Sequence, residues 1–297
     1  MKKKVLIIVG ILLITVLSLA SCSAMSTILH RTNTVNYQVD IRDLENPNVG
    51  TAVASNSVNS CARIVSVFTI GGKSKSVAGA GFVISADGYV ITNRHVTILY
   101  SNLMGDTTSD EKSTSTPIAH RPDQIRVVFS DDTYYEAEVV YFRDEIGEID
   151  LALLKMKNTG ATVFNYLSID QTSQVYYGQT AFTFGNPEGI GLLFTTVNVS
   201  NPSMKLSSDG KYYSIMLDGN INHGNSGGVL LDGNSKVIGV IFARIESKSG
   251  SNSNAYGIGC AIKSADLINF LVEYNTKATA SNKVNYSEYK PSEETSE

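Results

Sequence analysis

The chain has no tryptophan, only six prolines and only three cysteines among its 297 residues. Fifteen tyrosines and many Val, Ile, Thr and Ser residues favour strands over helices. Cys61 and Cys260 each lie in an apolar run, so we expect two buried free thiols, with one disulfide between them as the open alternative. No histidine spacing matches these cysteines, so the residues imply no zinc site. No other metal or organic cofactor is implied.

Basic clusters are also missing, apart from Lys2, Lys3 and Lys4 at the start of the chain. The formal charge is −4, and it becomes −7 when residues 1–21 are removed. A mildly acidic chain without a basic patch argues against nucleic acid as a partner and against polybasic membrane binding.

One long hydrophobic run follows these three lysines and ends at Ala20. The basic start and the apolar run predict a lipoprotein signal peptide over residues 1–21. Leu19-Ala20-Ser21-Cys22 resembles a bacterial lipobox, in which cleavage leaves Cys22 as the lipidated first residue. An uncleaved N-terminal anchor is the alternative, and both place the rest of the chain outside the cytoplasm. A diacylglyceryl group carries two acyl chains, enough for stable anchoring to the cell membrane.

Composition divides the exported part into three segments. Residues 22–59 are polar without a sustained period, which predicts a membrane tether. Residues 275–297 are poor in apolar residues and rich in Ser, Glu and Lys, which predicts a disordered tail. The folded domain is expected over residues 60–274.

Short β-type runs fill this domain in two sets. Six runs lie within about 60–157 and six within about 178–262, with turn signals such as Asp87-Gly88 between them. This pattern predicts an all-β fold of two packed six-stranded antiparallel barrels. Apolar residues at helical spacing over 264–274 predict one closing C-terminal helix.

Three short segments carry the chemistry. TNRHV contains His95, EIDLALLK contains Asp150 and GNSGG contains Ser226. The order His, Asp, Ser is that of chymotrypsin-type proteases and differs from the subtilisin and α/β-hydrolase orders. His95 follows an apolar strand, where a general base can face the serine, and Asp150 opens a buried strand, where its carboxylate needs a partner.

Glycines surround the serine in GNINHGNSGG, and they permit the tight turn that exposes a nucleophile. We expect an oxyanion hole within Gly224, Asn225 and Ser226, with the N–H groups of Gly224 and Ser226 as its donors. Asp131 and Asp132 also fall between His95 and Ser226 in the chain, but their turn-like context makes them solvated turn residues.

Five segments together resemble the HtrA/Deg branch of trypsin-like serine proteases. They are GAGFVISADGYVITNRHV, EIDLALLK, FGNPEG, INHGNSGGVLLDGNSKVIGV and GIGCAI, and they span about residues 60–272. The resemblance implies a serine endopeptidase in which His95 is the base, Asp150 orients it and Ser226 attacks. It also implies misfolded or unfolded exported proteins as substrates and a homotrimeric assembly.

The chain departs from the family pattern in three places. A polar tail stands where the family usually carries PDZ domains, so we expect no PDZ-mediated delivery in cis. His223 replaces a proline in the oxyanion loop; a solvent-facing histidine is favoured over a pH-sensitive role. The substrate pocket is expected to be lined by Phe242, Ala243, Arg244 and Ile245.

Two alternative functions stay open. Arg244 at the pocket rim could favour acidic substrates, as in narrow-specificity glutamyl endopeptidases, although its head is expected to point to solvent. A non-proteolytic holdase that kept the fold is the second alternative. An intact His95, Asp150 and Ser226 set argues against a holdase, because holding a chain does not require it.

Overall fold

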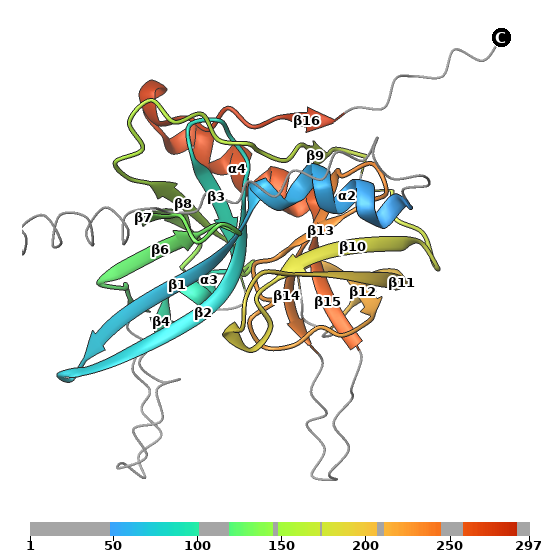
Figure 1. Cartoon of the computed structure of the whole chain (residues 1–297), viewed down its shortest axis with the longest axis horizontal. Coiled ribbons are helices and arrows are strands. Elements are labelled where there is room, and N and C mark those ends of the chain that lie inside the picture. The colour runs from blue at the N-terminus through green and yellow to red at the C-terminus, as the bar shows by residue number, and fades with distance from the viewer. Residues whose placement is uncertain are drawn as a thin grey trace, which may run out of the picture. The chain divides into compact units, whose positions relative to one another are not determined.

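The first six-stranded barrel contains His95 and Asp150 in its connecting segments. The structure is a computed structural model and describes residues 48–100, 119–144, 148–172, 174–206, 211–244 and 258–289. The barrel strands run in the order β1-β2-β3-β8-β7-β6 and close through an antiparallel β1–β6 pairing (Figure 1). Their bounds are β1 Cys61–Ile70, β2 Lys73–Val83, β3 Tyr89–Thr92, β6 Gln124–Val128, β7 Tyr134–Phe142 and β8 Ala152–Met156.

The second barrel has the same number of strands and contains Ser226 in the loop before β13. Its order is β13-β10-β11-β12-β15-β14, and an additional β13–β14 pairing closes the ring. The predicted all-β fold with two six-stranded antiparallel barrels is confirmed. The bounds are β10 Thr180–Gly185, β11 Leu193–Lys205, β12 Tyr213–Asp218, β13 Val229–Leu231, β14 Val237–Arg244 and β15 Ile258–Lys263.

Several strands bury both of their faces, which explains their continuous apolar runs. Successive side chains of a strand point to opposite faces. In β8, Leu154 packs inside the first barrel, while Leu153 belongs to a cluster outside it. In β13, Leu230 lies inside the second barrel, and Val229 and Leu231 join the same outer cluster. This cluster therefore contains residues from both barrels.

The segment between the barrels runs along the first one. The N–H groups of Phe164 and Leu167 donate to the carbonyls of Ala86 and Val83, each at 3.0 Å. Two residues, β9 (Ile169–Asp170), then join the second sheet, where Ile169 pairs in parallel with Val237 of β14.

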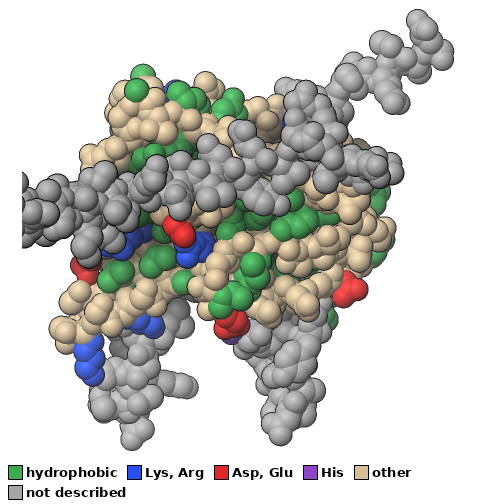
Figure 2. Space-filling model, in the orientation of Figure 1, with side chains coloured by type: hydrophobic (Ala, Val, Ile, Leu, Met, Phe, Trp, Pro, Cys, Tyr) green, Lys and Arg blue, Asp and Glu red, His purple; other side chains and the backbone are tan. Residues whose placement is uncertain are grey.

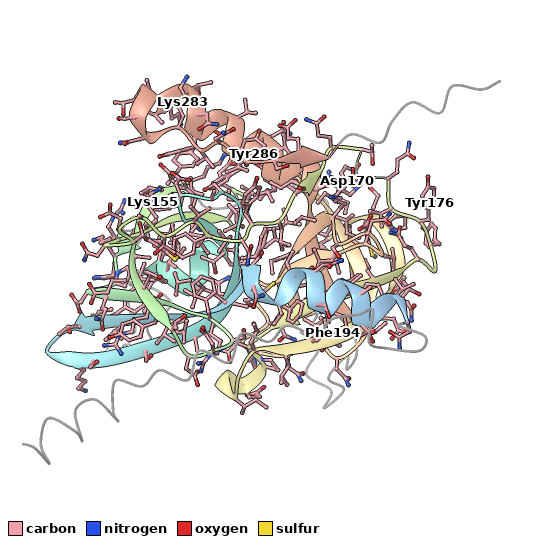
Figure 3. The ribbon with its side chains drawn as sticks, turned by 45° about the horizontal axis from the view of Figure 1, so that its top comes forward. Lys155, Asp170, Tyr176, Phe194, Lys283 and Tyr286 are labelled. Atoms are coloured by element: carbon pink, nitrogen blue, oxygen red, sulfur yellow. The ribbon has the colours of Figure 1, made fainter. Side chains whose placement is uncertain are left out.

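Residues 22–59 differ from the predicted tether at their described end. Helix α2 (Val49–Ser57) and a 3-10 turn at Val58–Ser60 lead directly into β1. Val53 is fully buried, and the helix lies against the stacked rings of Phe182 and Phe194, the latter labelled in Figure 3. The fold therefore begins before residue 60.

The predicted disordered tail, residues 275–297, also differs from the structure. Helix α4 (Ser264–Lys277) passes the predicted end of the helix by three residues. The side chain of Asn275 then exchanges two hydrogen bonds with the backbone of Val284, which is buried. Strand β16 (Glu288–Tyr289) pairs in parallel with β9 (Figure 1). The described part of this segment is thus folded onto the domain.

Both predicted thiols are buried and free, in different barrels. Cys61 begins β1, and Cys260 of β15 lies with its Sγ 3.8 Å from Met216 Sδ. Burial raises the pKa of both thiols, that of Cys260 to about 11. Neither is therefore a reactive thiolate at neutral pH.

Short elements complete the described chain. They are α3 (Arg94–Thr97), the paired strands β4 (Leu99–Tyr100) and β5 (Ala119–His120), and two 3-10 turns at Pro187–Gly189 and Ala280–Asn282. Asp131–Thr133 form a turn in which the Thr133 N–H and hydroxyl both donate to the Asp131 carboxylate. This agrees with the predicted turn at Asp131 and Asp132.

Residues 1–47, which include the predicted signal peptide 1–21 and Cys22, and residues 101–118 lie outside the described residues. Within those that are described, no helix is long and apolar enough to cross a membrane. Hydrophobic side chains reach the surface between polar ones on the face shown in Figure 2. Exposed apolar residues of this scattered kind are normal in a folded protein and carry no binding argument by themselves.

Candidate active site

His95 and Asp150 come from two different connections of the first barrel and are joined by two hydrogen bonds. His95 lies in α3, directly after β3, and Asp150 precedes β8. The ring Nδ1 of His95 lies 2.5 Å from Asp150 Oδ2, and the His95 backbone N–H donates to Oδ1 at 3.0 Å. Both carboxylate oxygens thus hold the same residue, which fixes the imidazole relative to the carboxylate.

Charge complementarity sets the protonation of this pair. Partial burial of the imidazole opposes its protonation, but the Asp150 carboxylate outweighs this effect, so the pKa of His95 lies above its ordinary value. Burial likewise opposes ionisation of Asp150, and the charge and hydrogen bonds of His95 still lower the pKa of that carboxyl. The His95 side chain keeps 47% of its surface exposed, so its remaining nitrogen can meet a reacting group.

Asn93 anchors the backbone on both sides of the pair. Its side chain is fully buried, and Nδ2 donates to the Asp150 carbonyl at 2.7 Å. Sequence reasoning did not single out this residue. Its signal was a polar side chain placed directly after the buried strand β3, where it must find a partner.

The Ser226 loop offers two backbone N–H groups without an internal acceptor. In this loop the N–H groups of Asn225, Gly227 and Gly228 donate to backbone carbonyls. Among the described residues, those of Gly224 and Ser226 have no backbone acceptor. Gly224 adopts φ +90° and Gly227 φ +83°, which a residue with a side chain rarely does. These glycines therefore allow the loop to leave both N–H groups for an external acceptor.

A turn after β10 holds this loop in place. The N–H of Glu188 donates to the His223 carbonyl at 2.7 Å, and that of Asn186 donates to the Gly224 carbonyl at 3.2 Å. Because C=O and N–H of one trans peptide point in opposite directions, the first bond turns the Gly224 N–H away from this turn. The residues next to Asn186–Gly189 in the chain indicate no role for this turn. The structure shows this turn supporting the Ser226 loop.

The Ser226 loop also presses against the segment that leads to His95. The Ser226 carbonyl accepts the Ala80 N–H of β2 at 2.8 Å. A Cβ on Gly227 would lie 2.3 Å from Thr92 Oγ1, and one on Gly79 would lie 2.9 Å from the Ser226 carbonyl oxygen. The two barrels therefore meet through backbone at this point, which only glycine permits.

We expect Gly224→Ala to reduce peptide hydrolysis by about 10²–10³-fold, the range for loss of one oxyanion donor. Its Cβ would lie 2.0 Å from the Asn186 carbonyl oxygen, so the loop must shift. Gly160→Ala is the matched control, because Gly160 also has positive φ but nothing within 4 Å of the added carbon. Steady-state kinetics on a fluorogenic peptide would measure both, and equal losses in the two variants would contradict the expectation.

The predicted site residues divide into three groups. His95, Asp150 and the Gly224–Ser226 loop occupy the neighbouring segments just described. Of the expected pocket residues, Phe242 lines a cavity of about 180 Å³ beside Asp150, together with Tyr212 and Tyr213. The side chains of Ala243 and Arg244, and all of Ile245, lie outside the described part of the structure. His223 is exposed in the Ser226 loop, and its role stays a prediction.

No group of three or more His, Cys, Asp or Glu side chains within the described ranges is placed to hold a metal ion.

Comparisons with known proteins agree on one family. A sequence profile described as the trypsin-like peptidase domain matches residues 79–240. The chain is 33% identical over 187 residues to a probable periplasmic serine endoprotease DegP-like of Bartonella henselae, covering 63% of this chain and 31% of that protein. It is 31% identical over 189 residues to protease Do-like 1, chloroplastic, of Arabidopsis thaliana, covering 62% and 36%.

Among solved structures, the chain is similar to the HtrA-type protease AlgW with tripeptide. The sequences are 26% identical, the TM-score is 0.57, and the match covers 76% of this chain and 63% of that one. The chain spans about a third of the length of the curated relatives it matches.

Proposed function

The chain belongs to the trypsin-like peptidase family, and we propose that it is a serine endopeptidase in which His95, Asp150 and Ser226 are catalytic. The observation that carries the proposal is the pairing of His95 Nδ1 and N–H with the two Asp150 oxygens, beside a loop that presents Ser226. Such a pair is needed where an imidazole must be held in one tautomer and then stabilised as a cation.

The proposed reaction begins when His95 Nε2 accepts the Ser226 hydroxyl proton. Oγ then forms a bond to the scissile carbonyl carbon, and the carbonyl oxygen becomes an oxyanion. The protonated His95 gives its proton to the leaving amine as the C–N bond breaks. Water, activated by the same imidazole, hydrolyses the acyl-enzyme and regenerates the Ser226 hydroxyl. Asp150 stays ionised and stabilises the imidazolium in both halves.

The oxyanion would be bound by the N–H groups of Gly224 and Ser226. Asn225, the third residue predicted in the oxyanion hole, donates its own N–H to the Asn222 carbonyl at 3.1 Å. Its buried side chain lies against Gly185, where a Cβ would be 2.2 Å from Asn225 Oδ1. We therefore assign Asn225 to holding the loop, and the donors to its two neighbours.

For substrates we propose exposed segments of misfolded or unfolded exported polypeptides, cut outside the cytoplasm. The resemblance to HtrA proteases and the name "periplasmic" of the matched relatives support this location. Lipid attachment at Cys22 and a homotrimeric assembly are further proposals that rest on the sequence and on the family resemblance.

Labelling with a fluorophosphonate tests the proposed function directly. The full chain is treated with the reagent, its intact mass is measured, and the modified peptide is mapped. We expect one adduct on Ser226 and none in His95→Ala, because the serine needs its base to react. A folded chain that takes up no adduct would contradict the proposal and favour the holdase alternative.

A further inference from the structure

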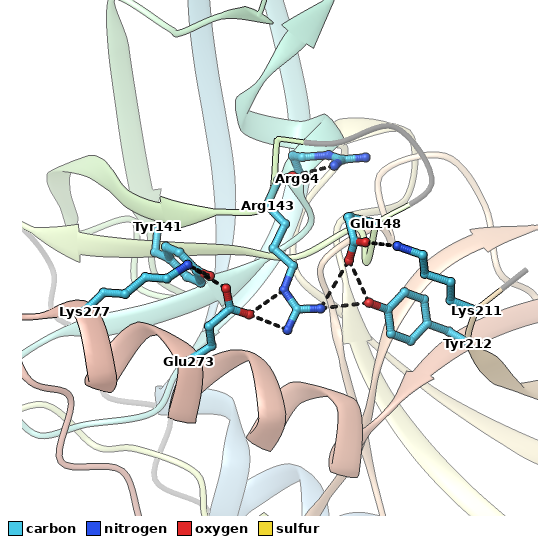
Figure 4. A network of polar contacts seen from close by, with 8 residues as sticks. All are labelled: Arg94, Tyr141, Arg143, Glu148, Lys211, Tyr212, Glu273 and Lys277. Carbon is cyan, nitrogen blue, oxygen red and sulfur yellow. Dashed lines mark hydrogen bonds and ion pairs between the residues drawn. The ribbon is translucent and has the colours of Figure 1, made fainter.

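A group of charged side chains surrounds Arg143, just after the end of β7 (Figure 4). Its Nε donates to Glu273 Oε2 of α4 at 2.8 Å, and its Nη2 lies 2.6 Å from the same oxygen. Its Nη1 donates to the Tyr212 hydroxyl at 2.7 Å and to Glu148 Oε2 at 3.3 Å. One guanidinium thus connects the first barrel to α4 and to the start of β12 in the second barrel.

The partners of Arg143 are themselves fully engaged. Glu148 also accepts hydrogen bonds from Tyr212, at 2.8 Å, and from Lys211. Glu273 accepts a bond from Lys277 at 2.6 Å. Hydrogen bonds from Lys211 and Tyr212 hold the pKa of Glu148 below its ordinary value, and those from Lys277 and Tyr141 lower the pKa of Glu273 to about 2. Both carboxylates therefore stay charged across the range in which a histidine titrates.

This group also borders the candidate active site on two sides. Glu148 stands two residues before Asp150, and only 12% of its side chain is exposed. The backbone carbonyl of Arg143 accepts a bond from Arg94 Nη1 at 2.6 Å, and Arg94 is the neighbour of His95 (Figure 4). Arg143 is thus bonded through its side chain to the Asp150 segment and through its carbonyl to the His95 helix.

From this arrangement we infer that Arg143 is a positioning residue for the His95–Asp150 pair. Its guanidinium fixes Glu148, and therefore the start of the Asp150 segment, against Tyr212 and Glu273. Its carbonyl holds Arg94, and therefore α3. The inference rests on the proposed function of the pair. It adds that the alignment of two first-barrel residues depends on the second barrel and on the C-terminal helix.

When Arg143 is replaced, loss of its charge and loss of the alignment that it maintains would have different effects on the pKa of His95. By Coulomb interaction alone, the pKa of His95 would stay unchanged or rise, because a positive charge is removed and Glu148 and Glu273 are left less compensated. Loss of alignment with Asp150 would weaken the interaction that raises this pKa and so lower it. Asp150 and Arg94 are the charged groups that act on His95 most directly. The sign of the shift therefore separates the two effects.

The test compares Arg143→Met with Lys155→Met. Lys155 is the matched control because its ion pair with Asp87 spans 2.6 Å and its side-chain exposure, 28%, is close to the 21% of Arg143. The His95 pKa is followed by NMR on the full chain labelled in its four histidines, with His95→Ala for assignment. The rate of fluorophosphonate labelling is measured on the same samples.

We expect Arg143→Met to lower the His95 pKa and to slow labelling about tenfold or more, as a small misplacement of catalytic groups does. Lys155→Met should leave both unchanged even if it destabilises the fold. An unchanged or raised His95 pKa in Arg143→Met would overturn the inference. If wild type shows no labelling but the pKa still falls in Arg143→Met, the proposed function fails and the positioning role stands.

Discussion

Ser226→Ala is expected to lower peptide hydrolysis by about 10⁵–10⁶-fold, while the protein keeps its fold. The reason is that Ser226 supplies the atom that attacks the substrate, and its neighbours supply only orientation and charge. The side chain is partly exposed, and the two N–H groups of its loop depend on backbone, so the alanine leaves their positions intact. Hydrolysis of a fluorogenic peptide and of an unfolded protein should fall together.

Ser66→Ala provides the matched control for this variant. Ser66 is a buried serine of β1 whose hydroxyl has no hydrogen-bond partner among the described residues. Its loss should therefore leave hydrolysis within about twofold and stability little changed. Circular dichroism and thermal unfolding would verify the folds. Substantial hydrolysis by Ser226→Ala would mean that another residue, or another protein in the sample, is the nucleophile.

Asp150→Asn is expected to have the second largest effect, a loss of about 10⁴-fold in kcat. The amide fills the same space as the carboxylate but carries no charge to stabilise the imidazolium. Its NH₂ group would also donate a hydrogen bond to His95 Nδ1, which favours the wrong tautomer, with the ring proton on Nε2. Asp170→Asn is the control, because Asp170 is buried and, among the described residues, its carboxylate accepts hydrogen bonds only from Thr172 in its own turn. It should hydrolyse peptide nearly as well as wild type.

The pH profile of kcat/KM should move in a defined direction in Asp150→Asn. Catalysis needs neutral His95, so activity rises as the pH passes upward through the pKa of this histidine. Asp150 raises that pKa in the wild type. Without the carboxylate, the pKa falls, and the acid limb of the profile moves to lower pH while the plateau drops. An acid limb that stays in place would show that Asp150 does not act on the base.

The strands of both barrels could be predicted because the pattern of apolar and turn residues along the chain agrees with the way the strands pack in the barrels. The six runs predicted within about 60–157 and the six within about 178–262 correspond to the strands of the first and the second barrel. Strands of this kind have apolar residues on one or both faces and end at turn residues such as Gly88, whose φ is +89°. A buried face and a turn are both written in neighbouring residues, which is why a local pattern finds them.

The two boundary errors share one physical cause. The predicted tether, residues 22–59, and the predicted tail, residues 275–297, are polar as whole segments. Their described parts are folded through a few buried residues and pairings, such as Val53 in α2, and Val284 with the β16 pairing in the C-terminal segment. Composition averages over a segment and gives a single buried valine little weight. Backbone pairing with β9, more than a hundred residues earlier in the chain, leaves no signal in the segment itself.

The residues of the candidate site also divide into those that the sequence could identify and those that only the structure shows. The order and neighbours of His95, Asp150 and Ser226 pointed to a triad because each residue lies in a short segment with its own strand or glycine context. Asn186 and Arg143 were missed because their importance lies in contacts with the Ser226 loop and the Asp150 segment. Neither contact can be read from the residues next to them.

The sequence by itself determined the all-β class, the two sets of six strands and the identity of the three residues expected to be catalytic. These depend on periodicity, turn chemistry and the order of short segments, which are local properties. Only the tertiary structure decided that both ends of the domain are folded, that the turn at Asn186 holds the Gly224 peptide, and that Arg143 joins α4 to the Asp150 segment. Such contacts form between residues far apart in the chain, and their energy depends on distance and burial, which appear only when the barrels pack together.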